Sequence, residues 1–486
     1  MPVASKEQAV VDAVPKGLYI GGEWRETEST VPVEDPSTGE VIAQVADATV
    51  DDALAALTAA ADAQKMWANT PSRERGEVLR KAYDLIMERV DDLALIMTLE
   101  MGKPLAESKA EVTYAADFFY WFAGEATRIE GGYKPAEKGG FRVLTMRQPV
   151  GPCIFITPWN FPLAMGTRKL GPQIAAGCTS VIKPAKQTPL SMLALVGILE
   201  EAGLPGGVVN VITAKSSGSI MEPLIKDPRA RKLSFTGSTP VGKKLIEQSA
   251  EQVLKVSMEL GGNAPFVVFE DADIDEAIEG AMLAKMRNIG EACTAANRFH
   301  VHESIADEFA QKLAERMGGL KIARGTEEDS KVGPLIDDDQ RGTVAELVDD
   351  ATSKGAKVLT GGERVDGPGY FYKPTVLADV PADARLLKEE IFGPVAPIAT
   401  FSTEEEAIAA ANDTEYGLVA YLYTKDLARA LRVSEALETG MIGLNQGVVS
   451  NAGAPFGGVK QSGFGREGGK VGIDEYLEWK YVAVAL

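Results

Sequence analysis

A single cysteine, Cys293, stands among small residues in the stretch GEACTAANR, which covers residues 290–298. A cysteine attacks as its thiolate, and with an ordinary pKa near ~8.5 it needs nearby dipoles, cations or a base at neutral pH. Glu259 in MELGGNAP could act as a base, and Asn160 in TPWNFP carries an amide able to hold an oxyanion. Because a lone cysteine is more often a small buried apolar residue, the rest of the chain must decide between these interpretations.

Two further stretches could bind anions. FTGSTPVG is typical of a strand that leads through Gly237 and Ser238 into a helix, and such a junction directs backbone N–H groups and the positive helix end at an anion. Lys183 ends the apolar run in VIKPAKQTP, where its ammonium group either reaches water or binds an anion. The chain has no G-x-G-x-x-G motif in this region, so these residues alone leave cofactor binding open.

The elements that position these residues follow an alternating pattern. From Cys153, short apolar runs alternate with helical patterns, the runs being CIFIT, TSVIK, GVVNVIT, LSFTG and LKVSMEL. Helices are expected at residues 164–176, from residue 190 and from residue 239. This alternation predicts a parallel, doubly wound α/β sheet, whose ligands bind at the carboxyl ends of its strands. A second α/β unit, carrying Cys293, is predicted from about residue 262 to about residue 444.

The amino-terminal part is predicted to be a small strand-rich segment at residues 17–40 followed by helices. We expect helices at residues 51–67, from Ser72 as the capping residue, and at residues 104–128. Residues 131–140 are rich in Gly, Lys and Pro and predict a loop. The following FRVLTMRQPVG alternates like an exposed strand. It is either an ordinary surface hairpin or a strand that needs other segments to pair with.

Composition limits the partners and the compartment. The 486 residues suggest roughly three structural units, and the net charge of −20 repels nucleic acid and anionic membranes. Three scattered cysteines suit a reducing compartment. The amino terminus MPVASKEQAVVDAV lacks a targeting pattern, and no apolar run is long enough to span a membrane. The sequence therefore predicts a cytoplasmic enzyme with no nucleic-acid or membrane partner, and it indicates no metal site.

Five motifs taken together resemble the aldehyde dehydrogenase superfamily, most closely its succinate-semialdehyde dehydrogenases. They are TPWNFP, FTGSTPVG, MELGGNAP, GEACTAANR and EEIFGP, spread over most of the chain. The resemblance implies a discontinuous cofactor-binding domain at 1–128 and 149–261 with a doubly wound parallel sheet. It also implies an α/β catalytic domain at 262–465 and a small β oligomerisation arm at 129–148 and 466–486. The strand after residue 140 would pair with the tail GIDEYLEWKYVAVAL and with a neighbouring subunit of a homodimer or homotetramer.

The resemblance also implies the reaction. The thiolate of Cys293 would add to an aldehyde carbonyl, and the Asn160 amide and the Cys293 backbone N–H would receive the oxyanion. The thiohemiacetal would give hydride to a nicotinamide and leave a thioester, which water activated by Glu259 would hydrolyse. The alternatives from other classes are a Cys–Glu thioesterase with no redox step and a non-catalytic scaffold.

Cofactor contacts are carried over residue by residue. Lys183 would bind the adenosine ribose, Gly237 and Ser238 the pyrophosphate, and Glu390 and Phe392 in EEIFGP the nicotinamide ribose. The strand-end residues Thr157, Pro158 and Trp159 are also assigned to the cofactor. The loop TAKSSGS departs from the family by having Ala214 where glycine is expected, so no contact is assigned to it.

Cofactor choice is predicted from Lys186. NAD-preferring relatives often have Glu at this position, where a carboxylate repels a 2′-phosphate. Lys183 and Lys186 together would place two ammonium groups near that phosphate, so we predict a preference for NADP over NAD. If Lys186 instead points to solvent, the enzyme would use both cofactors.

The substrate is predicted to carry a carboxylate at its far end. In the resemblance, Arg168 and Arg287 hold this carboxylate together with Ser450, and Phe161 and Phe456 wall the pocket. Hydrogen bonds to charged groups contribute about 1.5–3 kcal/mol each, so two arginines can decide specificity. The expected reaction is oxidation of succinate semialdehyde to succinate, a step of GABA degradation. Glutarate semialdehyde or another ω-carboxy aldehyde is the alternative substrate, and surface arginines without a function are the alternative interpretation.

Overall fold

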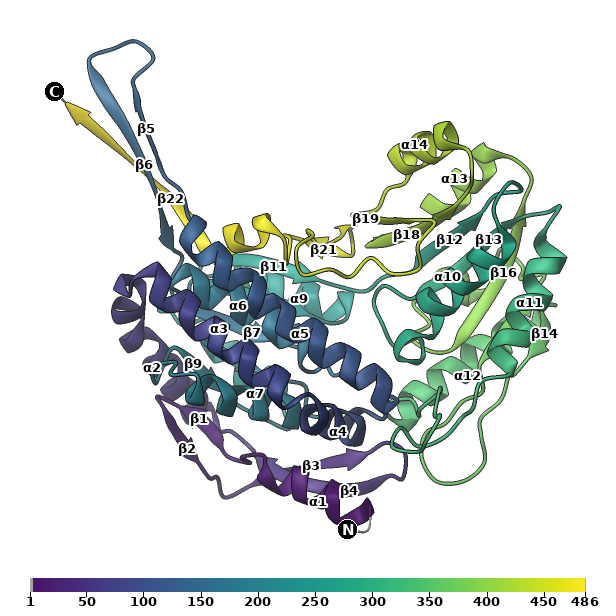
Figure 1. The fold of residues 1–486 in the computed structure, drawn as a ribbon, viewed down its shortest axis with the longest axis horizontal. Helices are drawn as coiled ribbons and strands as arrows, with labels where there is room; N and C mark the ends of the chain where they lie inside the picture. Colours follow the sequence, from purple (N-terminus) through teal and green to yellow (C-terminus); the bar gives the residue numbers. More distant parts are fainter. Residues whose placement is uncertain (1–2, 486) are drawn as a thin grey trace.

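The computed structural model describes residues 3–485, which form two α/β lobes and a projecting β arm (Figure 1). The predicted fold class is confirmed. Among the described residues, no helix combines the length and the apolar character needed to cross a lipid bilayer.

The first lobe is built on an eight-stranded sheet with the order β2-β1-β9-β8-β7-β10-β11-β21. Its five central strands are parallel, and β1, β2 and β21 pair antiparallel at the edges. The central strands are β7 (Cys153–Ile156), β8 (Ser180–Lys183), β9 (Val209–Val211), β10 (Lys232–Thr236) and β11 (Lys255–Glu259). The edge strands are β1 (Leu18–Ile20), β2 (Glu23–Arg25) and β21 (Gly463–Phe464). Since each central strand matches one predicted apolar run, ligand-binding side chains are brought to one edge of the sheet.

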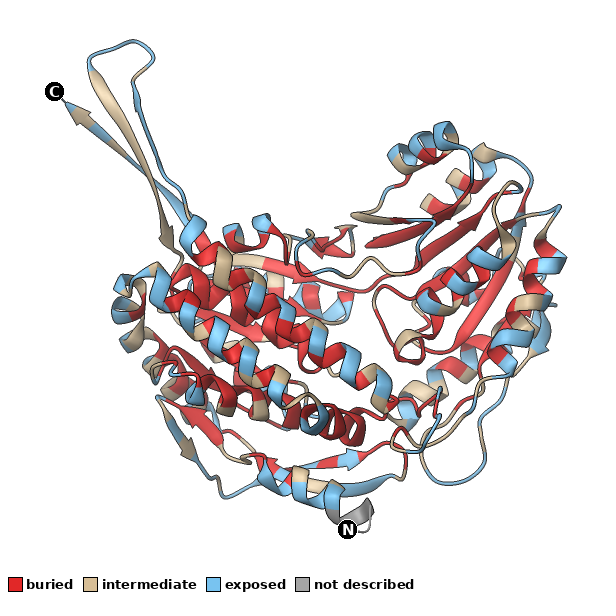
Figure 2. Ribbon diagram, in the orientation of Figure 1, coloured by how far each residue is buried: buried red, intermediate tan, exposed pale blue. Residues whose placement is uncertain are grey.

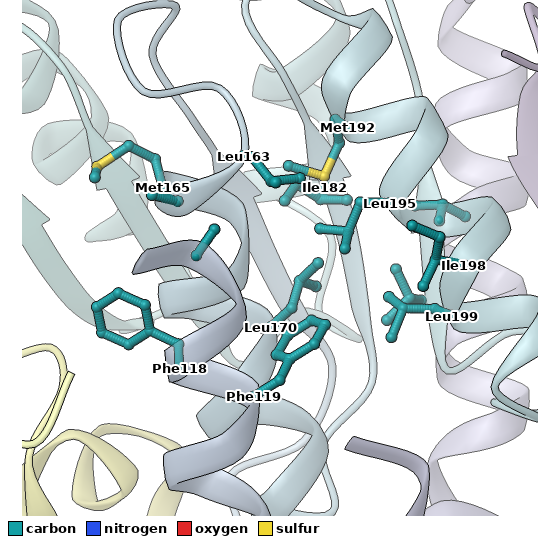
Figure 3. Close-up of a cluster of buried hydrophobic side chains, with 14 of the residues drawn as sticks. Phe118, Phe119, Leu163, Met165, Leu170, Ile182, Met192, Leu195, Ile198 and Leu199 are labelled. Atoms are coloured by element: carbon teal, nitrogen blue, oxygen red, sulfur yellow. The ribbon is translucent and has the colours of Figure 1, made fainter. Parts of the chain in front are cut away.

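Helices cover both faces of this sheet. One face carries α6 (Ala164–Ala176) and α7 (Leu190–Glu201) under an outer layer of α3 (Ser72–Glu88), α4 (Val90–Met101) and α5 (Leu105–Glu125). The other face carries α2 (Val50–Asn69), α8 (Ser217–Ile225) and α9 (Thr239–Ser249). Figure 3 shows Phe119, Leu170 and Leu195 meeting where α5, α6 and α7 come together. A Cβ atom at Gly166 would lie 2.1 Å from Cε of Met192, so glycine is what allows α6 and α7 to approach this closely.

Several local expectations are corrected. Ser72 is the first residue of α3 and makes no capping hydrogen bond, whereas Thr49 and Asp52 form a capping box at the start of α2. Helix α1 (Val3–Ala13) and helix α4 were not predicted. Most of α4 is buried, so its sequence lacks the alternation of polar and apolar faces by which a surface helix is recognised. Residues 131–140 are not all loop, because they contain β5 (Gly132–Pro135). Two further short strands, β3 (Thr30–Asp35) and β4 (Glu40–Ala46), pair with each other.

The second lobe is built on a seven-stranded sheet with the order β14-β15-β16-β13-β12-β18-β19, in which only β14 is antiparallel to its neighbour. The strands are β12 (Ala264–Val268), β13 (Ala296–His302), β14 (Lys357–Thr360), β15 (Thr375–Ala378), β16 (Val395–Phe401), β18 (Val419–Tyr423) and β19 (Met441–Leu444). Its helices are α10 (Ile274–Met286), α11 (Ala306–Gly318), α12 (Asp338–Ser353), α13 (Glu404–Asn412) and α14 (Leu427–Ala436). A separate apolar core fills this lobe (Figure 2).

The arm consists of β5, β6 (Phe141–Pro149) and β22 (Leu477–Ala485), with β6 in the middle. The register runs from Leu477 opposite Pro149 to Ala485 opposite Phe141, so the predicted pairing with the C-terminal tail is present. The arm projects away from both lobes (Figure 2). Apart from the buried Leu477 at its base, its strands are exposed or half-buried, and Trp479 and Tyr481 are more than half exposed. Pairing with a neighbouring subunit stays a prediction. The domain boundaries also stay a prediction. Strand β21 falls within residues 262–465, which were assigned to the catalytic domain, but it pairs with β11 of the first-lobe sheet.

Candidate active site

A cavity of about 290 Å³ lies where the carboxyl ends of β7, β10 and β11 face the segment that carries Cys293. Most of the predicted site residues line it. They are Pro158, Trp159, Asn160, Phe161, Arg168, Gly237, Ser238, Glu259, Arg287, Cys293, Glu390, Phe392, Ser450 and Phe456. Thr157, Lys183 and Lys186 lie outside this lining.

The segment before Cys293 has an unusual backbone. Asn288, Ile289 and Gly290 have φ values of 52°, 54° and 80°, three consecutive residues in the left-handed region. This conformation costs on the order of 1–3 kcal/mol per non-glycine residue. The strain is greatest for a β-branched side chain such as that of Ile289. It is held by the carboxylate of Glu107, which accepts the Asn288 N–H at 2.6 Å. The Asn288 side chain also donates to the backbone oxygen of Glu291 at 2.9 Å, which closes the turn in front of the cysteine.

The thiol of Cys293 is partly exposed to the cavity. Burial raises its pKa to about 12, and the carboxyl groups of Glu390 and Glu259 act in the same direction. The guanidinium groups of Arg168 and Arg287 lower the pKa but do not outweigh burial. Cys293 is therefore protonated at neutral pH in this geometry, and its attack requires that the proton be taken up by a base.

The side-chain amide of Asn160 is fixed by two hydrogen bonds, and one of its N–H groups remains unused. Its Nδ2 donates to the backbone oxygen of Glu291 at 3.0 Å, and its Oδ1 accepts the Phe161 N–H at 3.1 Å. Because an amide NH₂ has two donors, one N–H remains for the cavity. The backbone oxygen of Asn160 accepts from Lys103 Nζ at 2.7 Å, and Lys103 forms a buried ion pair with Glu111 at 2.5 Å. This arrangement suits an oxyanion donor that does not need to reorganise.

Glu259 ends β11 as a buried carboxyl group, and neither of its oxygens has a hydrogen-bond partner among the described residues. Burial and the nearby Glu467 raise its pKa well above the usual range, opposed by Arg168 and Lys169. A carboxyl group with a raised pKa and free lone pairs accepts a proton from water or a thiol more readily than an ordinary carboxylate does.

The two predicted carboxylate-binding arginines both line the cavity, and both lower the pKa values of Tyr114 and Cys293, so they lie close to the same groups. The guanidinium of Arg168, which is 2% exposed, stacks on Phe456 at 3.9 Å from the ring centroid. Its Nη2 lies 2.7 Å from a carboxylate oxygen of Glu467, whose other oxygen pairs with Lys169 at 2.5 Å. Arg287 Nη1 donates to the hydroxyl of Ser450 at 3.0 Å. The burial of Arg168 argues against the interpretation of both residues as surface arginines without a function.

The groups assigned to the nicotinamide side of a cofactor, Glu390 and Phe392, line the same cavity. Glu390 accepts the Gly262 N–H at 3.1 Å, and burial raises its pKa to about 7 against the opposing effects of that N–H group and Lys285. Phe392 packs edge-on against Trp159 with ring centroids 5.4 Å apart. Two buried hydroxyl groups near these strand ends have no partner in the part of the chain that the structure describes. They belong to Thr157 and Thr236. Unpaired donors at strand ends fit a ligand rich in hydroxyl and phosphate oxygens.

Lys183 and Lys186 lie next to each other at the end of β8. Lys183 is buried and donates to the Pro184 oxygen at 3.0 Å, while Lys186 is exposed. Burial and the charge of Lys186 lower the pKa of Lys183 to about 8. An anion bound between the two ammonium groups would offset both the burial and the repulsion, and it would raise the pKa of Lys183 again.

Gly237 is used differently from the expectation for a phosphate-binding turn. Its N–H donates to the backbone oxygen of Glu259 at 3.0 Å and is therefore not free. A Cβ atom at this position would lie 2.4 Å from the ring of Phe235, so the glycine gives room to that side chain. The unpaired N–H groups of the first turn of α9, after Ser238, are the ones left to face an anion.

Sequence reasoning missed several residues. Tyr114, Met165, Thr236, Leu260, Gly261, Thr294 and Gln340 also line the cavity. Three carboxylates support the site through groups next to it: Glu107, which is half-buried, and Glu111 and Glu467, which are buried. The only signal for Glu107 and Glu111 is a charge inside a largely apolar helical pattern, and Glu467 has no signal in the sequence.

Comparison with known proteins agrees with this geometry. A sequence model of the aldehyde dehydrogenase family matches residues 24–482. A succinate-semialdehyde dehydrogenase of Paenarthrobacter nicotinovorans is 58% identical over 445 residues, which cover 92% of this chain and 99% of that protein. A glutarate-semialdehyde dehydrogenase of Pseudomonas putida is 50% identical over 470 residues, covering 96% and 97%. The crystal structure of an E. coli NADP dependent enzyme superposes with a TM-score of 0.96 at 49% identity, covering 98% of this chain and 99% of that one.

Proposed function

Since the chain belongs to the aldehyde dehydrogenase family, we propose that it oxidises succinate semialdehyde to succinate with a nicotinamide cofactor. The observation that carries the proposal is the pair Arg168 and Arg287, which both line the cavity that holds Cys293. The family explains the nucleophile, and the arginines explain why the substrate should end in a carboxylate. The similarity to a succinate-semialdehyde dehydrogenase supports the same substrate.

The mechanism uses three residues of the chain. Glu259 takes the proton of the Cys293 thiol and passes it to solvent, the thiolate attacks the aldehyde carbonyl, and the free N–H of Asn160 receives the oxyanion that forms. The nicotinamide, when bound, supplies the hydride acceptor that makes oxidation to the acyl level possible. Glu259 then takes a proton from water, which attacks the acyl group on the cysteine and releases the acid. The unpaired oxygens of Glu259 are available for that water.

The cofactor is proposed to be NADP in preference to NAD. The adjacent ammonium groups of Lys183 and Lys186 support this choice, as does the similarity to an NADP dependent enzyme. Lys186→Glu should shift the kcat/KM ratio toward NAD and weaken NADP binding measured by fluorescence titration. Lys65→Glu, an exposed lysine on α2 with the same charge change, is the matched control. A wild type that prefers NAD, or a ratio that Lys186→Glu leaves unchanged, contradicts this part of the proposal.

Glutarate semialdehyde is the second candidate substrate, favoured by the similarity to a glutarate-semialdehyde dehydrogenase. One assay compares the candidates: reduced-nicotinamide absorbance is followed with succinate semialdehyde, glutarate semialdehyde and butyraldehyde, each with both cofactors. Cys293→Ala is the inactive control. A wild type that oxidises none of them removes the dehydrogenase proposal, and ester cleavage that ignores the cofactor favours the thioesterase.

We also propose that the arm pairs with a second copy of the chain. An exposed three-stranded ribbon bearing Trp479 and Tyr481 has too little of its own to pack against. Sedimentation of the intact chain, and of a variant with Trp479→Ser and Tyr481→Ser, tests this. A monomeric wild type would refute it.

A further inference from the structure

Tyr114, on α5, presents an unpaired hydroxyl to the cavity close to Arg168 and Arg287. It lines the cavity, and its hydroxyl oxygen is buried with no hydrogen-bond partner among the described residues. Its ring packs edge-on against Phe118 with centroids 5.0 Å apart, and the guanidinium of Arg287 lies 5.7 Å from the ring centroid. The ring is thus fixed by packing. The hydroxyl lies beside the Ser450 side chain, which opposes the rise of its pKa, but it meets no partner at hydrogen-bond geometry among the described residues.

An unpaired buried hydroxyl is unfavourable for the fold. Leaving such a donor without a partner costs about 1–3 kcal/mol relative to an apolar group of the same shape. Phenylalanine would fill the position of Tyr114 equally well and avoid that cost. The hydroxyl therefore indicates a ligand that provides the acceptor.

The neighbouring donors leave room for one more. Arg168 already uses one edge against Glu467 at 2.7 Å. The Ser450 hydroxyl accepts from Arg287 at 3.0 Å, so its own proton is free to donate. A carboxylate has about four lone-pair positions, so one that accepts a single N–H from each arginine and the serine proton keeps one position for a further donor. Burial raises the pKa of Tyr114, against the opposing charges of Arg168 and Arg287, so the hydroxyl keeps its proton at neutral pH.

We propose that the Tyr114 hydroxyl donates a hydrogen bond to the carboxylate of the substrate and that Tyr114 is a specificity-determining residue. This inference rests on the proposed function, because it needs a substrate that ends in a carboxylate. Tyr114 would add a neutral donor beside the cations Arg168 and Arg287. Its hydrogen bond would orient the substrate carboxylate without adding a further charge to this part of the cavity.

Tyr114→Phe removes only the hydroxyl and is the variant that tests the proposal. We expect the preference for succinate semialdehyde over butyraldehyde, measured as the ratio of kcat/KM values, to fall about ten- to a hundredfold. The inhibition constant of succinate should rise by a similar factor. The Tm should stay equal to that of the wild type or rise, because an unpaired buried hydroxyl is lost. Tyr120→Phe, on the same helix with a half-exposed ring, is the matched control and should change neither ratio nor inhibition constant.

The outcomes separate this inference from the proposed function. A wild type that shows no preference for succinate semialdehyde over butyraldehyde refutes the proposed function. A wild type with that preference, combined with a Tyr114→Phe variant that retains it, refutes only the role of Tyr114. Equal losses on both aldehydes, or a lowered Tm, would show that the hydroxyl serves the structure of the cavity and would also overturn the proposal.

Discussion

Arg168 and Arg287, the two arginines proposed to bind the substrate, should respond differently to removal, although both line the cavity. Arg287 is half-buried and its hydrogen bond goes to Ser450, so Arg287→Ala removes mainly a contact to the substrate. A hydrogen bond to a charged group contributes about 1.5–3 kcal/mol, which corresponds to about ten- to a hundredfold in kcat/KM. We expect this loss for succinate semialdehyde and a much smaller one for butyraldehyde.

Arg168→Ala should damage the protein as well as the specificity. It removes a buried cation from the network with Glu467 and Lys169 and leaves the Phe456 ring without its stacked guanidinium. Breaking a buried ion pair by deleting one partner costs about 3–5 kcal/mol. We therefore expect a clearly lower Tm and losses on every aldehyde.

A triple variant tests the reason for that difference. In Arg168→Met with Lys169→Met and Glu467→Gln, no unpaired charge of this network is left, so part of the Tm should return while the preference for succinate semialdehyde stays lost. The measurements are steady-state kinetics on both aldehydes and thermal unfolding of all variants. The reasoning is refuted if Arg287→Ala loses equally on butyraldehyde, or if Arg168→Ala unfolds at the wild-type temperature.

Three further predictions concern the catalytic groups. Asn160→Ala should lower kcat by on the order of 10²- to 10³-fold, since one oxyanion donor is lost, and a loss below tenfold would contradict its role. Alkylation of Cys293 by iodoacetamide in the cofactor-free enzyme should accelerate about tenfold per pH unit between pH 7 and 10, because a group with a pKa of about 12 gains thiolate throughout that range. A plateau below pH 8 would show that the thiolate is already formed. Peroxide should inactivate through sulfenic acid on Cys293 with no disulfide to it, because the other two cysteines, Cys153 and Cys178, are buried and Cys153 lies at the start of β7, away from the cavity. Mass spectrometry that detects a disulfide to Cys293 in the inactivated enzyme would overturn this.

The parts of the fold that could be predicted are those with local signals. The helix at residues 164–176 was predicted with the limits it has, and each apolar run after residue 153 became a strand. The converging motifs lie at strand ends, which is why residues as distant in sequence as Asn160 and Cys293 line one cavity. Helix α4 was missed since it is buried around most of its circumference.

The supporting residues could not be predicted because their partners are far away in sequence. Glu467 reaches Arg168 only through the folded C-terminal segment, and Glu107 reaches Asn288 across the two lobes. Nothing in the residues around Tyr114 indicates that its hydroxyl lacks a partner. The N–H of Gly237 was expected to be free, and the register of β10 against β11 is what assigns it to Glu259.

The C-terminal segment serves two purposes over a short stretch of chain. Glu467 holds Arg168, and a few residues later the Tyr476 oxygen accepts the Val150 N–H at 3.0 Å, where β22 begins its pairing along β6. In evolutionary terms, an insertion or deletion between these points would move the substrate arginine and the arm together. A change of length in this segment would therefore alter the surroundings of Arg168 and the start of the arm at the same time.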